Sequence, residues 1–236
     1  EDPMYILAGL PFIAPDYSSA WLLKDVQMEY LQEKFAKKGL MILYTAPWPG
    51  QGFYTKFPVN SVSDFKGKKL RIYSTATQQM GSMLGFNATI LPFAEIPQAF
   101  STGLIEALFT SPQTGIDIQA WDNTKHFTYA GAIFSKNAVV VTKKAFNALS
   151  KGDQSNMLAA AKKAELRGWE MSAETTKKQI GILKKNGMSS KNAPDEVISK
   201  MKSIGLEMMK NWRSKASPEA NCLLYTSPSP RDRYGS

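Results

Sequence analysis

Short apolar runs alternate with helix-like segments through the middle of the chain. Residues 70–73, 88–91 and 107–110 are three such runs, separated by two segments with helical spacing. Runs of this length between helical patterns predict parallel strands joined by helices, and therefore an α/β fold. In open α/β sheets the ligand crevice lies beyond the carboxyl ends of the strands. Small or ring-bearing residues follow each run there: Ser74-Thr75, Pro92-Phe93 and Ser111-Pro112.

The flanking patterns predict three further helices and two further strands. A helix is expected from Ser18 or Ser19 to about Lys37, a strand over residues 40–45, a loop over 46–58, and a strand over 138–142. Residues 153–186 form the longest helical pattern, about 34 residues or roughly 50 Å, so this helix must contact more than one lobe or project from the protein. Its predicted buried stripe is Leu166, Trp169, Ala173, Thr176, Ile180 and Leu183.

A last helix is predicted to open at Pro194, and the periodicity ends beyond Ser217. The buried face of that helix is predicted to be Val197, Met201, Ile204, Met208 and Trp212. The stretch 217–236 is rich in Ser, Pro and Arg, so we expect a disordered tail of translated vector sequence.

Composition narrows the class of protein. The chain has 236 residues, 43% hydrophobic and 21% charged, which is typical of globular domains. No apolar run approaches the roughly 18 residues of a membrane span, and no signal peptide is visible, so we expect a fragment or a processed form. The net charge of +9 makes nucleic-acid binding a hypothesis to consider. The lysines, however, occur as scattered pairs, and no nucleic-acid-binding motif accompanies them.

Motifs for catalysis and for cofactors are missing. Cys222 and His126 are the only residues of their types, which excludes an internal disulfide and Cys/His zinc sites. Gly67-Lys68 lacks the rest of a phosphate-binding loop, and no GxSxG or metal-ligand spacing occurs. We therefore predict no catalytic residues, no metal and no cofactor.

Arg71 interrupts the first apolar run. Because side chains alternate along a strand, Arg71 faces away from Leu70 and Ile72. One interpretation is a structural salt bridge or an edge-strand side chain in solvent. The other is a ligand contact, because the planar guanidinium fork suits a carboxylate.

Two motifs carry a resemblance to a known family. They are Ser61, Asp64, Phe65, Lys66, Gly67, Lys69, Leu70 and Arg71, then Pro92, Glu95, Ala99, Phe100 and Gly103. With them, the chain from about Tyr5 to about Trp212 resembles the dicarboxylate-type substrate-binding protein of tripartite ATP-independent periplasmic (TRAP) transporters. In that family the Arg matching Arg71 holds the carboxylate of the ligand.

The resemblance implies a two-lobed fold like that of type II periplasmic binding proteins, with a long inter-lobe helix and an incomplete first lobe. It places residues 1–54 in lobe I, 55–150 in lobe II as a βαβ core with its return strand, 151–187 in a spine helix across both lobes, 188–216 in a C-terminal helix and 217–236 in the non-native tail.

The predicted ligand site combines strand ends with the loop between the lobes. Asn137 is a hydrogen-bonding candidate or alternatively a turn residue, and the aromatic residues of the loop either wall the pocket or cap the core. The predicted ligand-binding residues are Arg71, Trp48, Gln51, Tyr54, Thr75, Phe93, Ser111 and Asn137. Relatives often carry a basic residue just before Pro58, where this chain has Phe57, which favours a monocarboxylate with an apolar part.

The resemblance implies an extracytoplasmic receptor that closes over a small organic acid and delivers it to the integral membrane subunits of a TRAP transporter. The expected location is the periplasm, and the expected state is a monomer that binds no nucleic acid. Two alternatives remain: a ligand-sensing partner of a membrane signalling protein, which would use the same cleft, and an α/β enzyme.

Overall fold

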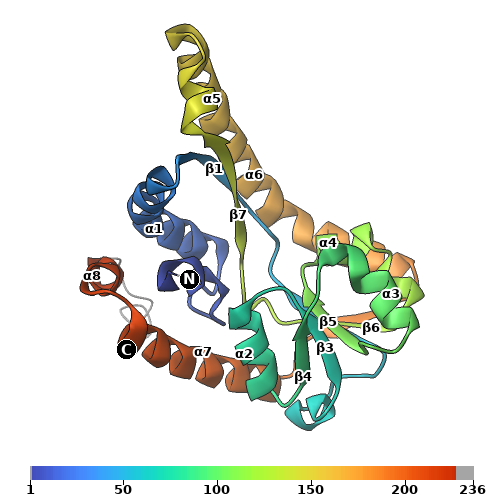
Figure 1. Ribbon diagram of the computed structural model, residues 1–236. Coiled ribbons are helices and arrows are strands. Elements are labelled where there is room, and N and C mark those ends of the chain that lie inside the picture. Colours follow the sequence, from blue (N-terminus) through green and yellow to red (C-terminus); the bar gives the residue numbers. More distant parts are fainter. Residues whose placement is uncertain (1, 227–236) are drawn as a thin grey trace.

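The computed structural model describes residues 2–226, which form two sheets with helices packed around them (Figure 1). The larger sheet has six strands in the order β4-β3-β5-β2-β6-β8, and the smaller sheet pairs β1 with β7. The strands of the larger sheet are β2 (Gly52–Thr55), β3 (Lys69–Ile72), β4 (Asn87–Ile90), β5 (Ala107–Thr110), β6 (His126–Tyr129) and β8 (Ser189–Asn192).

The three predicted parallel strands are confirmed. Strand β3 lies between β4 and β5 and runs parallel to both, and each strand lies within one residue of its predicted position. The connections contain α2 (Thr75–Met83) and α3 (Ile96–Ser101), as the helical spacing indicated. The carboxyl ends of β3 and β5 therefore open on the same edge of the sheet.

The prediction of a loop throughout residues 46–58 is wrong, because β2 lies in the middle of the sheet, antiparallel to both β5 and β6. A Cβ on Gly52 would lie 2.4 Å from the carbonyl oxygen of Thr128, so only glycine permits this approach. Phe53 and Tyr54 point to opposite faces, and each is fully buried in a different apolar cluster.

The smaller sheet consists of β1 (Leu40–Pro47) and β7 (Lys136–Thr142), which pair antiparallel with a register shift between Ile42 and Tyr44. The return strand, which the predicted division grouped with residues 55–150, thus pairs with β1 of residues 1–54, and the division into lobes stays a prediction. Helix α1 (Tyr17–Lys37) packs on β1, and α5 (Lys143–Asn147) follows β7. Asp16 caps α1 by accepting a hydrogen bond from the amide of Ser19 at 2.7 Å.

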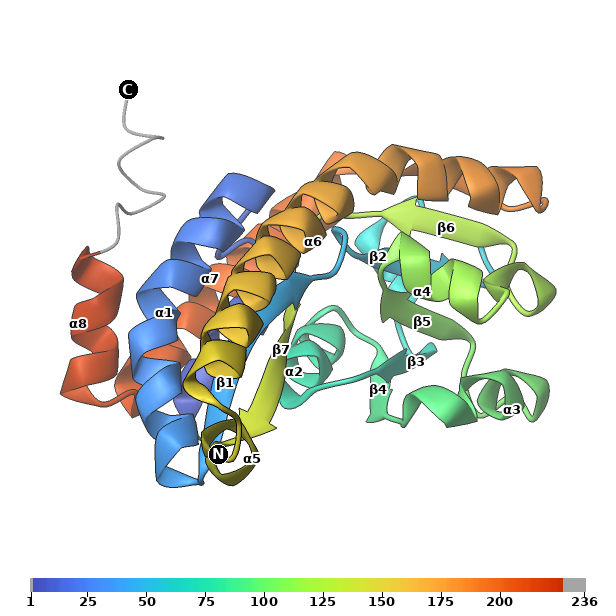
Figure 2. The ribbon, with the colours of Figure 1, turned by 90° about the horizontal axis from the view of Figure 1, so that it is seen from above.

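Helix α6 (Lys151–Lys185) contacts both sheet regions, as its length required (Figure 2). It packs against β1, against α4 (Pro112–Asp117) and against β8. The predicted stripe is wrong in part: Leu166 is 52% exposed and Ala173 is exposed. The buried positions include Trp169, Ser172, Gln179 and Leu183, because the helix presents polar side chains to Tyr17 and Gln113 where it crosses between the sheets.

Helix α7 (Asp195–Lys215) buries all five residues predicted for its apolar face. It packs on the first residues of the chain, which contain the 3₁₀ turns Pro3–Tyr5 and Leu7–Gly9. The indole nitrogen of Trp212 donates to the carbonyl of Pro3 at 2.7 Å. Residues distant in sequence thus close one apolar core.

The prediction of disorder from residue 217 is wrong for α8 (Pro218–Thr226), while residues 227–236 lie outside the described part. The Ser-Pro pair opens a helix, because the hydroxyl of Ser217 accepts from the amide of Ala220 at 3.1 Å and proline suits the first turn. Ala220 is buried and Cys222 is exposed.

None of the helices within residues 2–226 combines the length and the apolar character that crossing a bilayer requires.

Candidate functional site

Two strand ends and the helices that follow them form one wall of a cavity between the two sheets. Ser74 caps α2 and Ser111 caps α4, each accepting a hydrogen bond from the amide three residues later, at 3.3 Å and 3.2 Å respectively. Such caps fix the turn between strand and helix and so hold the strand-end side chains in place. The cavity measures about 660 Å³ and lies between this wall and the smaller sheet, a volume suited to a small organic ligand.

The structure brings seven of the eight predicted site residues together. Arg71, Trp48, Gln51, Thr75, Phe93, Ser111 and Asn137 all line this cavity. Phe93 is 52% exposed and Thr75 is also exposed, whereas Gln51 and Ser111 are buried.

Tyr54 lies elsewhere. Its ring is buried in the smaller apolar cluster, and its hydroxyl lies 3.2 Å from the carbonyl of Ser111 and 3.4 Å from that of Pro112, to which it donates. Burial, with a contribution from Asp117, raises the pKa of Tyr54, so the hydroxyl stays neutral. Tyr54 therefore supports the start of α4 from behind.

Arg71 is a buried cation that opens on the cavity. The residue is 5% exposed, and its Nε donates to the carbonyl oxygen of Leu91 at 3.0 Å. Burial lowers the pKa of Arg71, although an arginine stays protonated at neutral pH. Within the described chain Arg71 forms no salt bridge, so its terminal nitrogens remain available for an anion.

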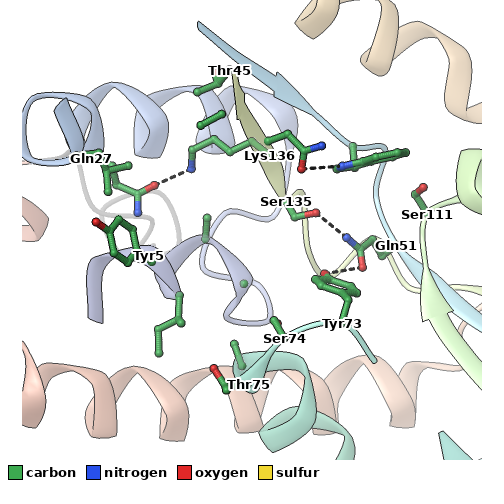
Figure 3. A pocket seen from close by; sticks show the side chains of 18 of the residues that line it. Tyr5, Gln27, Thr45, Gln51, Tyr73, Ser74, Thr75, Ser111, Ser135 and Lys136 are labelled. Carbon is green, nitrogen blue, oxygen red and sulfur yellow. Dashed lines mark hydrogen bonds between the residues drawn. The ribbon is translucent and has the colours of Figure 1, made fainter. Parts of the chain in front are cut away.

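A chain of hydrogen bonds crosses the base of the cavity. The hydroxyl of Tyr73 donates to Oε1 of Gln51 at 2.8 Å, and Nε2 of Gln51 donates to Oγ of Ser135 at 2.8 Å (Figure 3). Burial raises the pKa of Tyr73 to about 12, so the phenol remains a donor. These two hydrogen bonds fix the orientation of the Gln51 amide. They also connect Tyr73, which follows β3, to the segments between the two sheets.

The smaller sheet supplies the facing wall. Asn137 lies within β7, opposite Ala46, rather than in a turn, and its Oδ1 accepts from the indole nitrogen of Trp48 at 3.3 Å. Next to it Lys136 donates to Oε1 of Gln27 at 2.7 Å (Figure 3). Burial and the nearby Lys24 lower the pKa of Lys136 to about 8.

The polar residues of the cavity that sequence reasoning missed include Lys136, Gln27, Tyr73 and Ser135. Lys136 carried a signal like that of Arg71, a lone charge at the start of an apolar strand. Gln27 carried none, because a single amide within an amphipathic helix is common.

The segment around Phe57 does not supply a second cation to the cavity. The amine of Lys56 donates to the carbonyl of Phe100 at 3.3 Å, and Phe57 packs on the larger apolar cluster. Across residues 2–226 there is also no group of three His, Cys, Asp or Glu side chains arranged to hold a metal ion. The cavity is thus a cationic, partly apolar pocket.

Comparison with known proteins gives one family match and several similar structures. The model of the family described as bacterial extracellular solute-binding protein, family 7, matches residues 2–215. A curated solute-binding protein of Chromohalobacter salexigens is 25% identical over 187 residues, which is 75% of this chain and 55% of that protein. The chain therefore spans about half the length of this relative.

Three solved structures with more than 30% identity share the fold. The Bordetella pertussis extracytoplasmic solute receptor DctP7, which binds pyroglutamic acid, is 36% identical with a TM-score of 0.92, covering 95% of this chain and 74% of its own. The B. pertussis receptor DctP6, which also binds pyroglutamic acid, is 36% identical with a TM-score of 0.90. The match covers 94% of this chain and 74% of DctP6. A TRAP solute-binding protein of an unidentified marine microbe, specific for pyroglutamate, is 31% identical with a TM-score of 0.88, covering 94% and 73%.

Proposed function

Since the chain belongs to the family 7 bacterial extracellular solute-binding proteins, we propose that it is a receptor that binds a small organic acid and delivers it to a TRAP-type transporter. The observation that carries this proposal is Arg71, a buried guanidinium that lines the cavity without an acid partner in the described residues. A buried cation of this kind is costly unless an anion completes it.

The carboxylate of the ligand binds the terminal nitrogens of Arg71 through paired, charge-assisted hydrogen bonds. The contact of Nε with Leu91 orients the guanidinium before the ligand arrives, which reduces the entropy lost on binding. Ser111 and Thr75, at the starts of the two helices, are placed for further hydrogen bonds to the same ligand.

Pyroglutamate is the ligand that we propose. Three relatives of 31–36% identity bind it, and it combines one carboxylate with a compact, partly apolar ring. Trp48 and Phe93 offer apolar surface for such a ring. A monocarboxylate also agrees with the position of Phe57, which lies outside the cavity lining.

We further propose that the protein works outside the cytoplasm, as a monomer in solution, with two integral membrane subunits of a TRAP transporter as its partners. The relatives support this setting, since two are extracytoplasmic solute receptors and the third is a TRAP solute-binding protein. The proposal needs no catalytic residue, because the receptor acts by binding and release alone.

A thermal-shift screen of organic acids tests the proposal, with pyroglutamate, succinate, lactate and benzoate in the panel. A ligand at 100 times its Kd adds about 2.7 kcal/mol of stability, which corresponds to a rise in Tm of roughly 5–10 °C for a chain of this size. We expect that rise with pyroglutamate and a smaller one with the other acids. A panel in which no carboxylate raises Tm would contradict the proposal.

A further inference from the structure

The cavity contains a second cation, Lys136. Arg71 can bind a single carboxylate without it. Lys136 begins β7 and lines the same cavity as Arg71, which comes from β3 of the other sheet. Its amine donates to the side-chain oxygen of Gln27 at 2.7 Å. Among the residues that the structure describes, no carboxylate pairs with Lys136.

The charged side chains near the amine of Lys136 already form ion pairs and hydrogen bonds with other groups. Lys24 of α1 repels it, and Lys24 itself is paired with Asp25 at 2.6 Å and with Glu165 of α6 at 3.5 Å. The other carboxylate oxygen of Glu165 accepts from the amide of Thr45 at 2.9 Å and from its hydroxyl at 2.7 Å. The nearby acid therefore serves Lys24 and β1 and leaves Lys136 without a counter-charge.

One neutral acceptor does not satisfy an ammonium group. The protonated amine has three N–H donors, and Gln27 accepts one hydrogen bond. Lys136 is only partly exposed, and a partly desolvated ammonium with unused donors is destabilising; this desolvation accordingly lowers the pKa of Lys136 to about 8. A ligand oxygen placed beside this amine would offset that cost.

The two cations reach the cavity from different directions. Figure 3 shows the side chain of Lys136 extending away from Ser111 and Gln51 toward Gln27, on the side of the smaller sheet. Arg71 lies on the side of the larger sheet, where β3 pairs with β5 and Ser111 follows β5. A ligand with acceptors at two ends can therefore contact both sheets at once.

We propose that Lys136 is a second ligand-binding residue, which donates a hydrogen bond to an acceptor of the ligand other than the carboxylate held by Arg71. This inference rests on the proposed function and specifies the substrate class: small acids that carry a second oxygen acceptor, such as the lactam carbonyl of pyroglutamate. Acids without that acceptor leave the amine uncompensated and bind more weakly. The second contact also links ligand binding to the approach of the two sheets.

A matched pair of ligands and a matched pair of variants test this inference by calorimetry. Pyroglutamate carries the ring carbonyl, and tetrahydrofuran-2-carboxylate keeps the ring and the carboxylate without it. Lys136→Met removes the amine and keeps the apolar stem, and Lys143→Met removes an exposed lysine of α5 as a control. We expect Lys136→Met to weaken pyroglutamate about 10- to 100-fold, as for a lost charged hydrogen bond, and to leave the carbonyl-free acid within about two-fold. Circular dichroism verifies that each variant is folded.

Proton uptake on binding gives a second readout that a purely structural lysine would not change. At pH 9 the free amine is mostly neutral, so binding of pyroglutamate takes up close to one proton, whereas at pH 6.5 it takes up none. Calorimetry in buffers of different ionisation enthalpy measures the number of protons taken up on binding. We expect this number to fall to zero in Lys136→Met and to be unchanged in Lys143→Met.

The failure of this inference is distinguishable from failure of the proposed function. Equal binding of pyroglutamate by the wild type and Lys136→Met, without proton uptake at pH 9, would overturn the role of Lys136 and leave the receptor intact. An equal loss for both ligands would overturn the assignment of a second acceptor. Absence of carboxylate binding by the wild-type chain would instead overturn the proposed function itself.

Discussion

At the scale of single residues, the site is dominated by two cations, the buried Arg71 and the partly buried Lys136, whose partners are neutral oxygens. Arg71 contacts the carbonyl of Leu91, and Lys136 contacts the amide oxygen of Gln27. Neither has a carboxylate partner in the described residues, so the protein itself leaves the positive charge of the cavity unbalanced. Such an arrangement favours an anionic ligand and reduces the stability of the empty protein.

The stability of the empty protein is expected to rise with pH through the titration of Lys136. Its pKa is lowered from 10.5 to about 8, so between these values the unfolded chain binds more protons than the folded chain. The free energy of unfolding then rises by up to about 3 kcal/mol across that window, and below pH 8 the penalty is constant. Urea unfolding from pH 7 to 9.5 measures the slope. Lys136→Met is expected to lose it and Lys143→Met to keep it; parallel curves for all three proteins would refute the titration.

Sequence reasoning found Ser111 from its place at the end of a strand, and Arg71 as a lone charge within a strand whose role the family resemblance implied. Lys136 and Gln27 could not be paired in the same way. They lie 109 positions apart and meet only because β7 pairs with β1 while α1 packs on β1. Tyr54 shows the opposite error, since an aromatic side chain in a predicted loop proved to be core.

At the scale of elements, α4 is held in place by contact with β2 from behind. A Cβ on Gly115 would lie 2.0 Å from the hydroxyl oxygen of Tyr54 and 2.3 Å from its ring, and Tyr54 is fully buried and cannot move aside. The glycine therefore permits the helix that carries Ser111 to approach the sheet.

Gly115→Ala is expected to destabilise the protein by about 1–3 kcal/mol through overpacking and to weaken ligand binding by displacing Ser111. Gly168→Ala is the control, because nothing lies within 4 Å of its Cβ and alanine favours a helix interior by about 0.5–1 kcal/mol. Chemical denaturation compares the two, and Tyr54→Phe should partly rescue Gly115→Ala by removing the clashing oxygen. Equal stability of both alanine variants would contradict this packing.

Local patterns predicted the elements that carry their own signal and missed those that depend on distant partners. The long helix and the three parallel strands have clear periodicity, and their predictions are confirmed. Strand β2 lies among Pro and Gly residues typical of loops, and β8 reads Ser-Ser-Lys-Asn, a polar edge strand without a hydrophobic signal. Both are stabilised by pairing with β6, which no local pattern reveals.

At the scale of the whole molecule, two paired segments connect the sheets beside α6. The amide of Trp48 donates to the carbonyl of Ser135 at 2.7 Å, and the amide of Gly131 donates to that of Gln51 at 2.9 Å. We expect the sheets to rotate about these short connections while each sheet remains intact, because hinges are commonly a few residues between packed units.

If the ligand contacts both sheets, it is expected to favour a more closed molecule. Small-angle scattering should then show a smaller radius of gyration with saturating pyroglutamate than without it, for the wild type and not for Arg71→Ala. The reason is that a ligand shifts a conformational equilibrium only by its differential affinity for the two states. A radius unchanged by saturating ligand would show that binding occurs without closure.

The affinity of Arg71 variants for pyroglutamate tests the central claim most directly. Titration calorimetry at pH 7 compares the wild type, Arg71→Lys and Arg71→Ala, with Arg167→Ala as an exposed control on α6. Loss of the paired hydrogen bonds should weaken binding by about 10- to over 100-fold in Arg71→Ala, with a partial loss in Arg71→Lys, which keeps the charge without the fork. The control should bind as the wild type does. Pyroglutamate bound with equal affinity by Arg71→Ala would contradict the carboxylate contact on which the receptor proposal depends.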